Sequence, residues 1–227
     1  MRMPEVQKRR FRLSMLRKSE YRYVWMLLFW PIFGMLFGYL ERGCANTGYY
    51  PVHCALDDKI PFCEYFLIPY LFWFVYLGAA IIVPLFVDVP VFKKTMRFIM
   101  LTYTITIVIY ILFPTCQNLR PAEFARDNVL TRFVARFYQF DTNTNVCPSI
   151  HVIGSVAAML CFASMKPLQK PVWQVLNIVS MLLICISTVF LKQHSVIDVL
   201  AAIPVCGIGY LLGFRVRENN PNGGATR

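Results

Sequence analysis

The chain contains six long stretches without a charged residue, and this pattern limits what it can fold into. A helix needs about 20 mostly apolar residues to cross the hydrocarbon of a bilayer. The stretches approach that length, and 57% of the 227 residues are hydrophobic, with a mean hydropathy of +0.52. We therefore predict an all-α polytopic membrane protein, a bundle of six transmembrane helices. The stretches are Val24–Leu40, Tyr65–Val87, Phe98–Leu119, Pro148–Met165, Val172–Leu191 and Val199–Phe214.

Basic residues are concentrated at the N-terminus, directly before the first apolar stretch. Residues 1–22 carry eight basic and two acidic side chains, which account for more than half of the net charge of +11. Basic segments beside membrane spans lie on the cytoplasmic side, and those after the second, fourth and sixth stretches fall on the same side as this one. We therefore expect cytoplasmic termini and a multi-pass protein of the plasma membrane, without nucleic-acid binding. The full-length first stretch lacks a small-residue cleavage site, which argues against a cleaved signal peptide.

Two histidines lie beside apolar stretches, where an imidazole needs polar partners or water. With a cytoplasmic N-terminus, His151 begins the fourth span at the outer face, and His194 lies just before the sixth span at that face. Topology alone therefore predicts that both histidines and Asp198 share one membrane depth. Two unrelated interfacial histidines are the alternative. His53 has no such neighbours and is interpreted as an ordinary loop residue.

Asp198 follows His194 by four residues, so the two side chains share a face if the sixth helix begins near them. A carboxylate in that position can accept one imidazole N–H, fix the tautomer and leave the other nitrogen free to attack. Helix capping or packing explains the same spacing, so the spacing alone leaves both interpretations open.

A phosphate site is predicted where the fourth span begins. Pro148 suits the first turn of a helix, and the free N–H groups and dipole of that helix end favour an anion. Ser149 adds a hydroxyl donor, and His151 suits proton transfer. Arg120 offers a guanidinium that can hold phosphate oxygens in a bidentate way, and Lys192 adds a second positive charge.

Five cysteines lie in segments predicted at the outer face, and three lie within spans. The three within spans are interpreted as small apolar packing residues. The outer cysteines can form disulfides if that compartment is oxidising. Cys44 with Cys54 is one candidate pair, and the odd number leaves one thiol over. The outer five are Cys44, Cys54, Cys63, Cys116 and Cys147, and the inner three are Cys161, Cys185 and Cys206.

Three motifs on the six-span chain resemble, in their order and spacing, those of the type 2 phosphatidic acid phosphatase family. That family groups with bacterial acid phosphatases, vanadium haloperoxidases and sphingolipid phosphotransferases. The resemblance begins near residue 98 and ends near residue 213. The Lys-Gln-His-Ser-Val-x-Asp pattern of residues 192–198 resembles the branch that includes inositol phosphorylceramide synthases. The motif residues are Arg120 and Pro121; Pro148, Ser149 and His151; and Ser187, His194 and Asp198.

The resemblance implies a membrane-embedded enzyme that acts on a lipid phosphate without a metal or another cofactor. It implies that His194 forms a phosphohistidine, that Asp198 stabilises the imidazolium, and that His151 protonates the leaving oxygen. Water then releases phosphate, whereas a second alcohol would make the enzyme a lipid phosphotransferase of the inositol phosphorylceramide or sphingomyelin synthase type. A membrane lipid is the expected partner, and no oligomeric state is predicted. The expected phosphate-binding residues are Arg120, Ser149, Ile150, Lys192 and Ser187.

The chain departs from the family pattern at three positions. Phe113 replaces a lysine before the arginine of the first motif, Ile150 replaces a glycine, and Thr188 replaces an arginine. Two phosphate-binding cations are therefore missing, and Lys192 is the candidate replacement for one. A non-catalytic lipid-binding relative is thus a further alternative. A transporter is disfavoured because the last three stretches hold almost no ionisable residue at mid-membrane.

The chain is divided into a basic cytoplasmic segment, residues 1–22, a six-span membrane catalytic domain, residues 23–214, and a cytoplasmic tail, residues 215–227. Within the domain, residues 121–141 alternate apolar and charged side chains at roughly helical spacing. The pattern predicts an amphipathic helix in the outer interface between the third and fourth spans. This helix is either a connection with a solvated face or a gate for the lipid.

Overall fold

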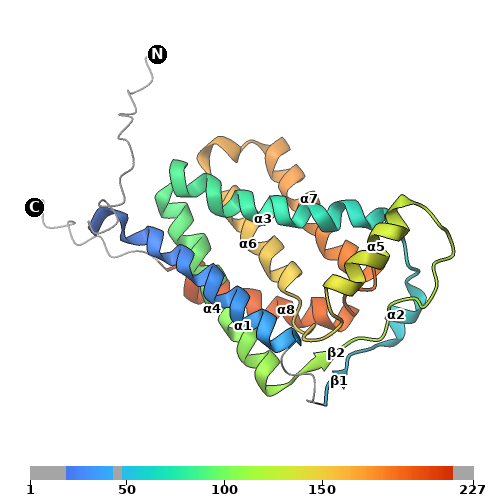
Figure 1. Ribbon diagram of the computed structural model, residues 1–227. Helices are drawn as coiled ribbons and strands as arrows, with labels where there is room; N and C mark the ends of the chain where they lie inside the picture. The colour runs from blue at the N-terminus through green and yellow to red at the C-terminus, as the bar shows by residue number, and fades with distance from the viewer. Residues whose placement is uncertain (1–18, 43–47, 217–227) are drawn as a thin grey trace, which may run out of the picture.

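The computed structural model describes residues 19–42 and 48–216, which fold mainly into helices (Figure 1). Most of the basic segment, most of the tail and Cys44 lie outside the described residues. The longer helices are α1 (Phe29–Arg42), α3 (Leu67–Val87), α4 (Val89–Leu112), α5 (Val129–Phe140), α6 (Ile150–Ser164), α7 (Pro171–Phe190) and α8 (Val196–Gly209). The shorter elements are η2 (Ser19–Leu28), α2 (Ala55–Lys59), η3 (Glu64–Phe66), η4 (Lys166–Leu168), the π-helical η5 (Tyr210–Phe214), and the parallel pair β1 (Tyr50–Pro51) and β2 (Thr115–Cys116).

Five helical segments of the described chain are long and apolar enough to cross a membrane. They correspond to all the predicted stretches except the fourth, which forms α6. This helix has 15 residues and is shorter than the length of about 20 that a crossing needs. The all-α, polytopic membrane fold is therefore confirmed, and the number of six spans stays a prediction. The five segments are Tyr21–Arg42, Glu64–Val87, Val89–Leu112, Pro171–Phe190 and Val196–Phe214.

The outer surface of α7 shows why this bundle belongs in a membrane. Large apolar side chains are exposed along most of the helix, including Val175, Leu176 and Leu183. A helix at the surface of a soluble protein would carry polar residues on that face. An exposed apolar surface of this kind is favourable in contact with lipid hydrocarbon, so the chain is an integral membrane protein.

The third membrane helix begins earlier than its apolar stretch predicts. α4 starts at Val89 instead of near Phe98, so the basic segment that follows the second apolar stretch forms the first turns of this helix. The cause is Asp88, whose side chain accepts a hydrogen bond from the N–H of Val91 at 3.2 Å and caps the helix. An N-cap fixes the start of a helix locally, so the helix begins before the basic side chains and includes them.

The predicted amphipathic helix is present but shorter than residues 121–141. α5 begins at Val129 because Asn128 and Thr131 form a reciprocal capping box, with bonds of 3.0 and 2.9 Å. Its buried Val134 belongs to an apolar cluster with Tyr70 of α3. α5 lies at the same end of the bundle as α2 (Figure 1).

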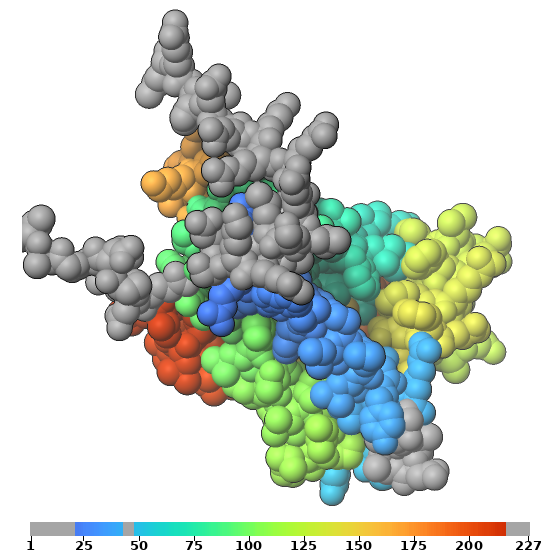
Figure 2. All heavy atoms as spheres, turned by 60° about the vertical axis from the view of Figure 1, so that its left-hand side comes forward, coloured from blue at the N-terminus to red at the C-terminus, as the bar shows by residue number. Residues whose placement is uncertain are grey.

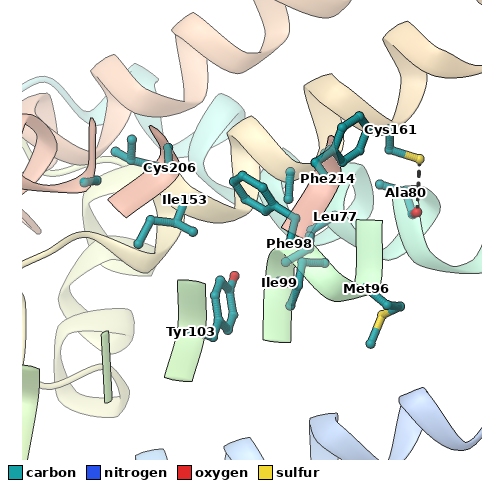
Figure 3. Packing of buried hydrophobic residues seen from close by; sticks show 14 of the residues in the cluster. Leu77, Ala80, Met96, Phe98, Ile99, Tyr103, Ile153, Cys161, Cys206 and Phe214 are labelled. Atoms are coloured by element: carbon teal, nitrogen blue, oxygen red, sulfur yellow. Dashed lines mark hydrogen bonds between the residues drawn. The ribbon is translucent and has the colours of Figure 1, made fainter. Parts of the chain in front are cut away.

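The main core lies where α3, α4, α6 and α8 meet (Figure 3). Buried Ile99 and Tyr103 of α4 pack there with Ile153 of α6. Next to Ile153, Gly154 allows close helix contact, since a Cβ at this position would lie 2.7 Å from the Tyr103 hydroxyl and 3.0 Å from the ring of Trp73. The glycine thereby brings the start of α6 against α3.

The described cysteines are free thiols, so the predicted disulfides are not formed among them. Cys54 precedes α2, where its N–H donates to the Asp57 carboxylate at 2.8 Å. Burial and the nearby Asp198 carboxylate raise the pKa of the Cys147 thiol to about 12, so this thiol stays protonated near neutral pH. Cys161 of α6 and Cys206 of α8 are buried, which agrees with a packing role.

Candidate active site

His151, His194 and Asp198 lie together at one end of the bundle. Nδ1 of His151, in the first turn of α6, lies 3.3 Å from Nε2 of His194. On the other side of the His194 ring, Nδ1 lies 3.2 Å from Oδ2 of Asp198 in the first turn of α8. The exposed fractions of the three residues are 8%, 5% and 0%, so water competes little for these contacts. The structure brings together the three residues that topology and spacing relate.

Asp198 also caps α8, so capping and the contact with histidine occur together. Its Oδ2 accepts the N–H of Ser195 at 2.9 Å in addition to the bond with the His194 ring. The same oxygen therefore fixes the helix start and the imidazole. Because Nδ1 of His194 faces a carboxylate, the proton belongs on Nδ1, and Nε2 keeps its lone pair.

The loop that carries His194 is held from two other segments. Nε2 of Gln117 donates to the carbonyl oxygen of Lys192 at 2.9 Å, and the hydroxyl of Tyr138 donates to that of Leu191 at 2.6 Å. Both carbonyls lie outside a regular helix and would lack partners without these side chains. The position of the loop is thus fixed by hydrogen bonds to β2–α5 and to α5 itself.

Asp57 of α2 is buried against the start of α8, with 1% of its surface exposed. Its carboxylate accepts hydrogen bonds from Oγ of Ser195 at 2.6 Å and from the N–H of Val196 at 2.8 Å. Burial raises the pKa of Asp57, but these bonds and those from Cys54 outweigh it, so the pKa lies below its usual value. Sequence analysis missed Asp57, since an acidic loop residue between two spans carries no motif.

Lys192, which the sequence suggests as a phosphate-binding charge, points away from the cavity in the structure. Its ammonium donates to the carbonyl oxygens of Asp57 at 2.6 Å and Ile60 at 2.5 Å. Burial lowers the pKa of this ammonium, although the acidic side chains of α2 raise it. The residue does not line the cavity beside the histidines. Lys192 therefore ties the histidine loop to α2.

Arg120 contacts the histidine loop through Gln193 and does not contact His194 itself. Its guanidinium donates to the carbonyl oxygens of Tyr138 at 3.0 Å and Thr142 at 2.8 Å, and lies over the Tyr138 ring. A further bond of 2.5 Å runs to Oε1 of Gln193, the residue before His194. Three guanidinium donors are thus used within the protein, whereas the buried Nε has no partner among the described residues, so phosphate binding by Arg120 stays a prediction.

Ser149 caps α6, and its side chain accepts from the N–H of Val152 at 3.4 Å. The helix begins at Ile150, so Pro148 precedes it and does not occupy its first turn as predicted. Ile150 lines the cavity, whereas the fully buried Ser149 does not.

The remaining positions of the family pattern do not line the cavity, although the carbonyl oxygen of Thr188 accepts the backbone N–H of His194 at 3.1 Å. Ser187 and Thr188 are inside α7, where their hydroxyls donate to carbonyl oxygens of the preceding turn at 2.6 and 2.8 Å. Phe113, which follows α4, is 62% exposed. None of the three lines the cavity, so the family departures at Phe113 and Thr188 do not alter its wall.

A cavity of about 580 Å³ lies beside the histidines. The His151 ring contacts two aromatic rings of its wall, with centroids 4.7 Å away for Tyr70 and 4.5 Å for Trp73. Arg42, at the end of α1, is the only lysine or arginine among the described lining residues. Its Nη2 donates to the carbonyl oxygen of Phe140 at 3.3 Å. Sequence analysis missed this arginine and both rings because none belongs to a recognisable pattern.

Two carboxylates, those of Glu41 and Asp141, line the same cavity. Oδ2 of Asp141 accepts the hydroxyl of Tyr70 at 3.2 Å, and Oε1 of Glu41 accepts that of Thr142 at 3.0 Å. Burial raises the pKa of Asp141, while the positive charge of Arg120 partly offsets this effect. The site thus combines two imidazoles with both signs of charge.

The family model of the PAP2 superfamily matches residues 94–221. No curated protein and no solved structure matches the chain. The matched segment contains His151, His194 and Asp198, and it leaves the branch within the superfamily undetermined. It covers more than half of the 227 residues. The chain therefore belongs to the PAP2 superfamily.

Proposed function

We propose that the chain is a metal-independent lipid phosphatase, which hydrolyses a lipid phosphate monoester or pyrophosphate through a phosphohistidine on His194. Membership of the PAP2 superfamily and the apolar helices support a function of the membrane lipid phosphatase type. The observation that carries the specific reaction is the line of contacts from His151 through His194 to Asp198, beside a cavity.

The roles follow from the direction of each nitrogen. Nε2 of His194 forms a bond to phosphorus while the bond from phosphorus to the lipid oxygen breaks. Asp198 stabilises the imidazolium that results, and His151 gives a proton to the leaving oxygen. A water molecule then loses a proton to His151, attacks phosphorus and frees His194 with release of phosphate.

The two imidazoles touch each other, so a bound phosphate must separate them. Attack in line requires phosphorus about 3 Å from the nitrogen, with the leaving oxygen on the far side. The nitrogens of His151 and His194 are only 3.3 Å apart. One ring therefore moves when phosphate binds, and the hydrogen bond between the rings holds the site closed until then.

We assign the binding of the negatively charged phosphate to Arg42, because this residue lines the cavity. Arg120 assists through Gln193, whose Oε1 it holds next to His194. The helix dipole at the start of α6 adds a weaker attraction for an anion. This set differs from the predicted one, in which Lys192 took part.

Transfer of the phosphoryl group to a second alcohol is a second candidate function. The phosphohistidine would react with an alcohol oxygen in place of water, which makes the protein a lipid phosphotransferase. The carboxylates of Glu41 and Asp141 in the cavity favour this reaction, because they can accept hydrogen bonds from hydroxyl groups.

The function is tested with the purified chain in detergent. Phosphatidic acid, phosphatidylglycerol phosphate, a polyprenyl pyrophosphate and a mixture of ceramide with phospholipid are supplied separately. Free phosphate indicates a phosphatase, and a new phospholipid indicates a transferase. We expect His194→Ala and His151→Ala to abolish either product, and EDTA to leave turnover unchanged. Turnover like that of the wild type in His194→Ala would overturn the mechanism.

A further inference from the structure

One end of the cavity is rich in hydrogen-bond acceptors. Glu41 lies in the last turn of α1, and Asp141 and Asn145 follow α5. These three acceptor-bearing side chains line the cavity that the histidines also line. Gln193 completes this end, next to His194. We call Glu41, Asp141, Asn145 and Gln193 the acceptor end. Its composition does not suit a bare phosphate, because two carboxylates repel added negative charge.

The carboxylates of the acceptor end are only partly used within the protein. Among the described residues, Asp141 accepts one hydroxyl, from Tyr70, and Glu41 accepts one, from Thr142. In the same part of the chain, neither carboxylate forms an ion pair. A carboxylate has two oxygens and about four lone-pair positions. Each therefore retains capacity for further donors, which a ligand can supply.

Two buried amides beside the histidines each have one unpaired polar atom. Asn145 is 4% exposed, and its Nδ2 donates to the carbonyl oxygen of Leu40 at 3.1 Å, while its Oδ1 has no partner. Gln193 is 3% exposed, and its Oε1 accepts from Arg120, while its Nε2 has no partner. Buried polar atoms are nearly always paired in folded proteins, so an unpaired one needs an explanation. Here both belong to residues that line the cavity beside the histidines.

We propose that the acceptor end is a subsite for an alcohol that carries hydroxyl or ammonium donors, bound beside the reacting phosphorus. This inference rests on the proposed function, in which His194 attacks that phosphorus. The donors of the alcohol bind Glu41, Asp141 and Oδ1 of Asn145, and one of its oxygens accepts from Nε2 of Gln193. Acceptors outnumber donors in the subsite, so a group with several donors fits better than a bare phosphate.

The alcohol can come from two sources with the same chemistry. It is either the head group already esterified to the phosphate of the lipid, or a free alcohol that accepts the phosphoryl group. In the first case the leaving oxygen keeps the electron pair of the broken bond to phosphorus and receives a proton from His151. In the second case the hydroxyl of the alcohol gives its proton to His151, and its oxygen bonds to phosphorus as the bond to His194 breaks.

Two arms of one experiment distinguish the sources. The first compares kcat/KM for phosphatidylethanolamine with that for phosphatidic acid of identical acyl chains. The second supplies phosphatidic acid with glycerol and measures glycerol phosphate against inorganic phosphate by mass spectrometry. We expect a ratio of about ten in at least one arm. This ratio is kcat/KM for phosphatidylethanolamine over that for phosphatidic acid in the first arm, and glycerol phosphate over inorganic phosphate in the second. A few hydrogen bonds can supply such a difference.

Asp141 is the residue to change, because Asn at this position can still accept a hydrogen bond from the Tyr70 hydroxyl. Asp141→Asn is expected to lower the preference for the alcohol at least about fivefold, and Glu41→Gln to lower it less. The exposed Glu123→Gln, which removes a carboxylate outside the cavity, is the matched control. The same preference in Asp141→Asn and in the control overturns the subsite.

Failure of the proposed function is recognised separately. If no lipid is turned over in either arm, the phosphatase proposal fails, and calorimetry then decides on the subsite. The full chain with His194→Ala is titrated with glycerophosphoethanolamine and with glycerol 3-phosphate. Tighter binding of the former, weakened by Asp141→Asn, supports the subsite. Equal or tighter binding of glycerol 3-phosphate overturns it.

Discussion

The two sides of the histidine cavity are built in different ways. The loop that carries His194 is fixed by side chains from α5 and the segment after β2, and by the bonds of Lys192 and Ser195 to Asp57 of α2. Another part of the wall is α1, which lies at the surface of the bundle beside α4 (Figure 2). Along this helix, Gly34 and Gly38 line the cavity and have open space around them, and Met35 is 70% exposed.

The difference separates two physical requirements of one site. A nucleophile needs a fixed position, since misplacement by about 1 Å can reduce the rate a hundredfold. A wall that receives lipid chains must adapt to molecules of different shape, and few packing contacts make such adaptation inexpensive in free energy. We therefore expect substitutions on the histidine side to affect turnover most, and substitutions on the α1 side to affect substrate binding.

Asp198→Asn gives the largest expected effect. The amide oxygen can still accept the His194 ring N–H and the Ser195 N–H, which both bond to one oxygen of Asp198, but the amide carries no negative charge. We expect the rate of phosphate release to fall about a thousandfold or more, because the His194 imidazolium loses its anionic partner. The surface carboxylate Asp58, changed to Asn, is the control and should leave the rate unchanged. A loss of less than tenfold would mean that the histidine side needs no fixed partner.

Asp57→Asn tests whether the hydrogen bonds from α2 position the loop. We expect kcat to fall about a hundredfold with a smaller change in KM, and the free energy of unfolding to fall by about 1–3 kcal/mol. Ser195→Ala removes only one of the hydrogen bonds that the Asp57 carboxylate accepts, so the loss of kcat and of stability should be smaller.

The acid stability of the protein gives a second measurement for Asp57. Its pKa is lower in the folded chain than in the unfolded one, so its contribution to stability is complete above the unfolded pKa. That contribution is lost as the pH falls through the folded pKa. The difference in unfolding temperature between the wild type and Asp57→Asn should therefore shrink at acid pH. A constant difference would exclude the ionised carboxylate as the cause.

Arg42→Met compared with Lys192→Met tests which cation binds phosphate. Loss of the guanidinium that lines the cavity should raise KM for a lipid phosphate about tenfold, the value of one hydrogen bond to a charged group. Lys192→Met should instead lower the unfolding temperature, because the loop loses its bonds to the carbonyls of Asp57 and Ile60. The reverse result, with KM raised by Lys192→Met alone, would restore the assignment made from the sequence.

A pair of glycine substitutions gives the smallest expected effect on turnover. Gly154→Ala places a methyl group against Tyr103 and Trp73, so the free energy of unfolding should fall by about 1–3 kcal/mol. Gly38→Ala adds the same methyl group where no atom lies within 4 Å, and stability should change by less than about 0.5 kcal/mol. Thermal unfolding of both variants in one detergent measures the difference. Equal losses would show that α1 is packed as tightly as α6.

The apolar stretches predict the membrane helices well because the requirement is local. Each span has to cover the hydrocarbon with its own residues, so length and composition suffice. Helix ends were less predictable. Asp88 and Asn128 start α4 and α5 through side-chain caps that a search for uncharged residues overlooks.

The sequence by itself determined the fold class and brought His151, His194 and Asp198 into one hypothesis, since a spacing of four residues and the alternation of spans are geometric constraints on any helical bundle. Only the tertiary structure decided which charges face the cavity. The contact between Asp57 and Ser195 joins residues 138 positions apart, and the direction of the Lys192 ammonium depends on carbonyls in another loop. Such contacts form only after the helices pack, because each depends on distant backbone groups that no local pattern encodes.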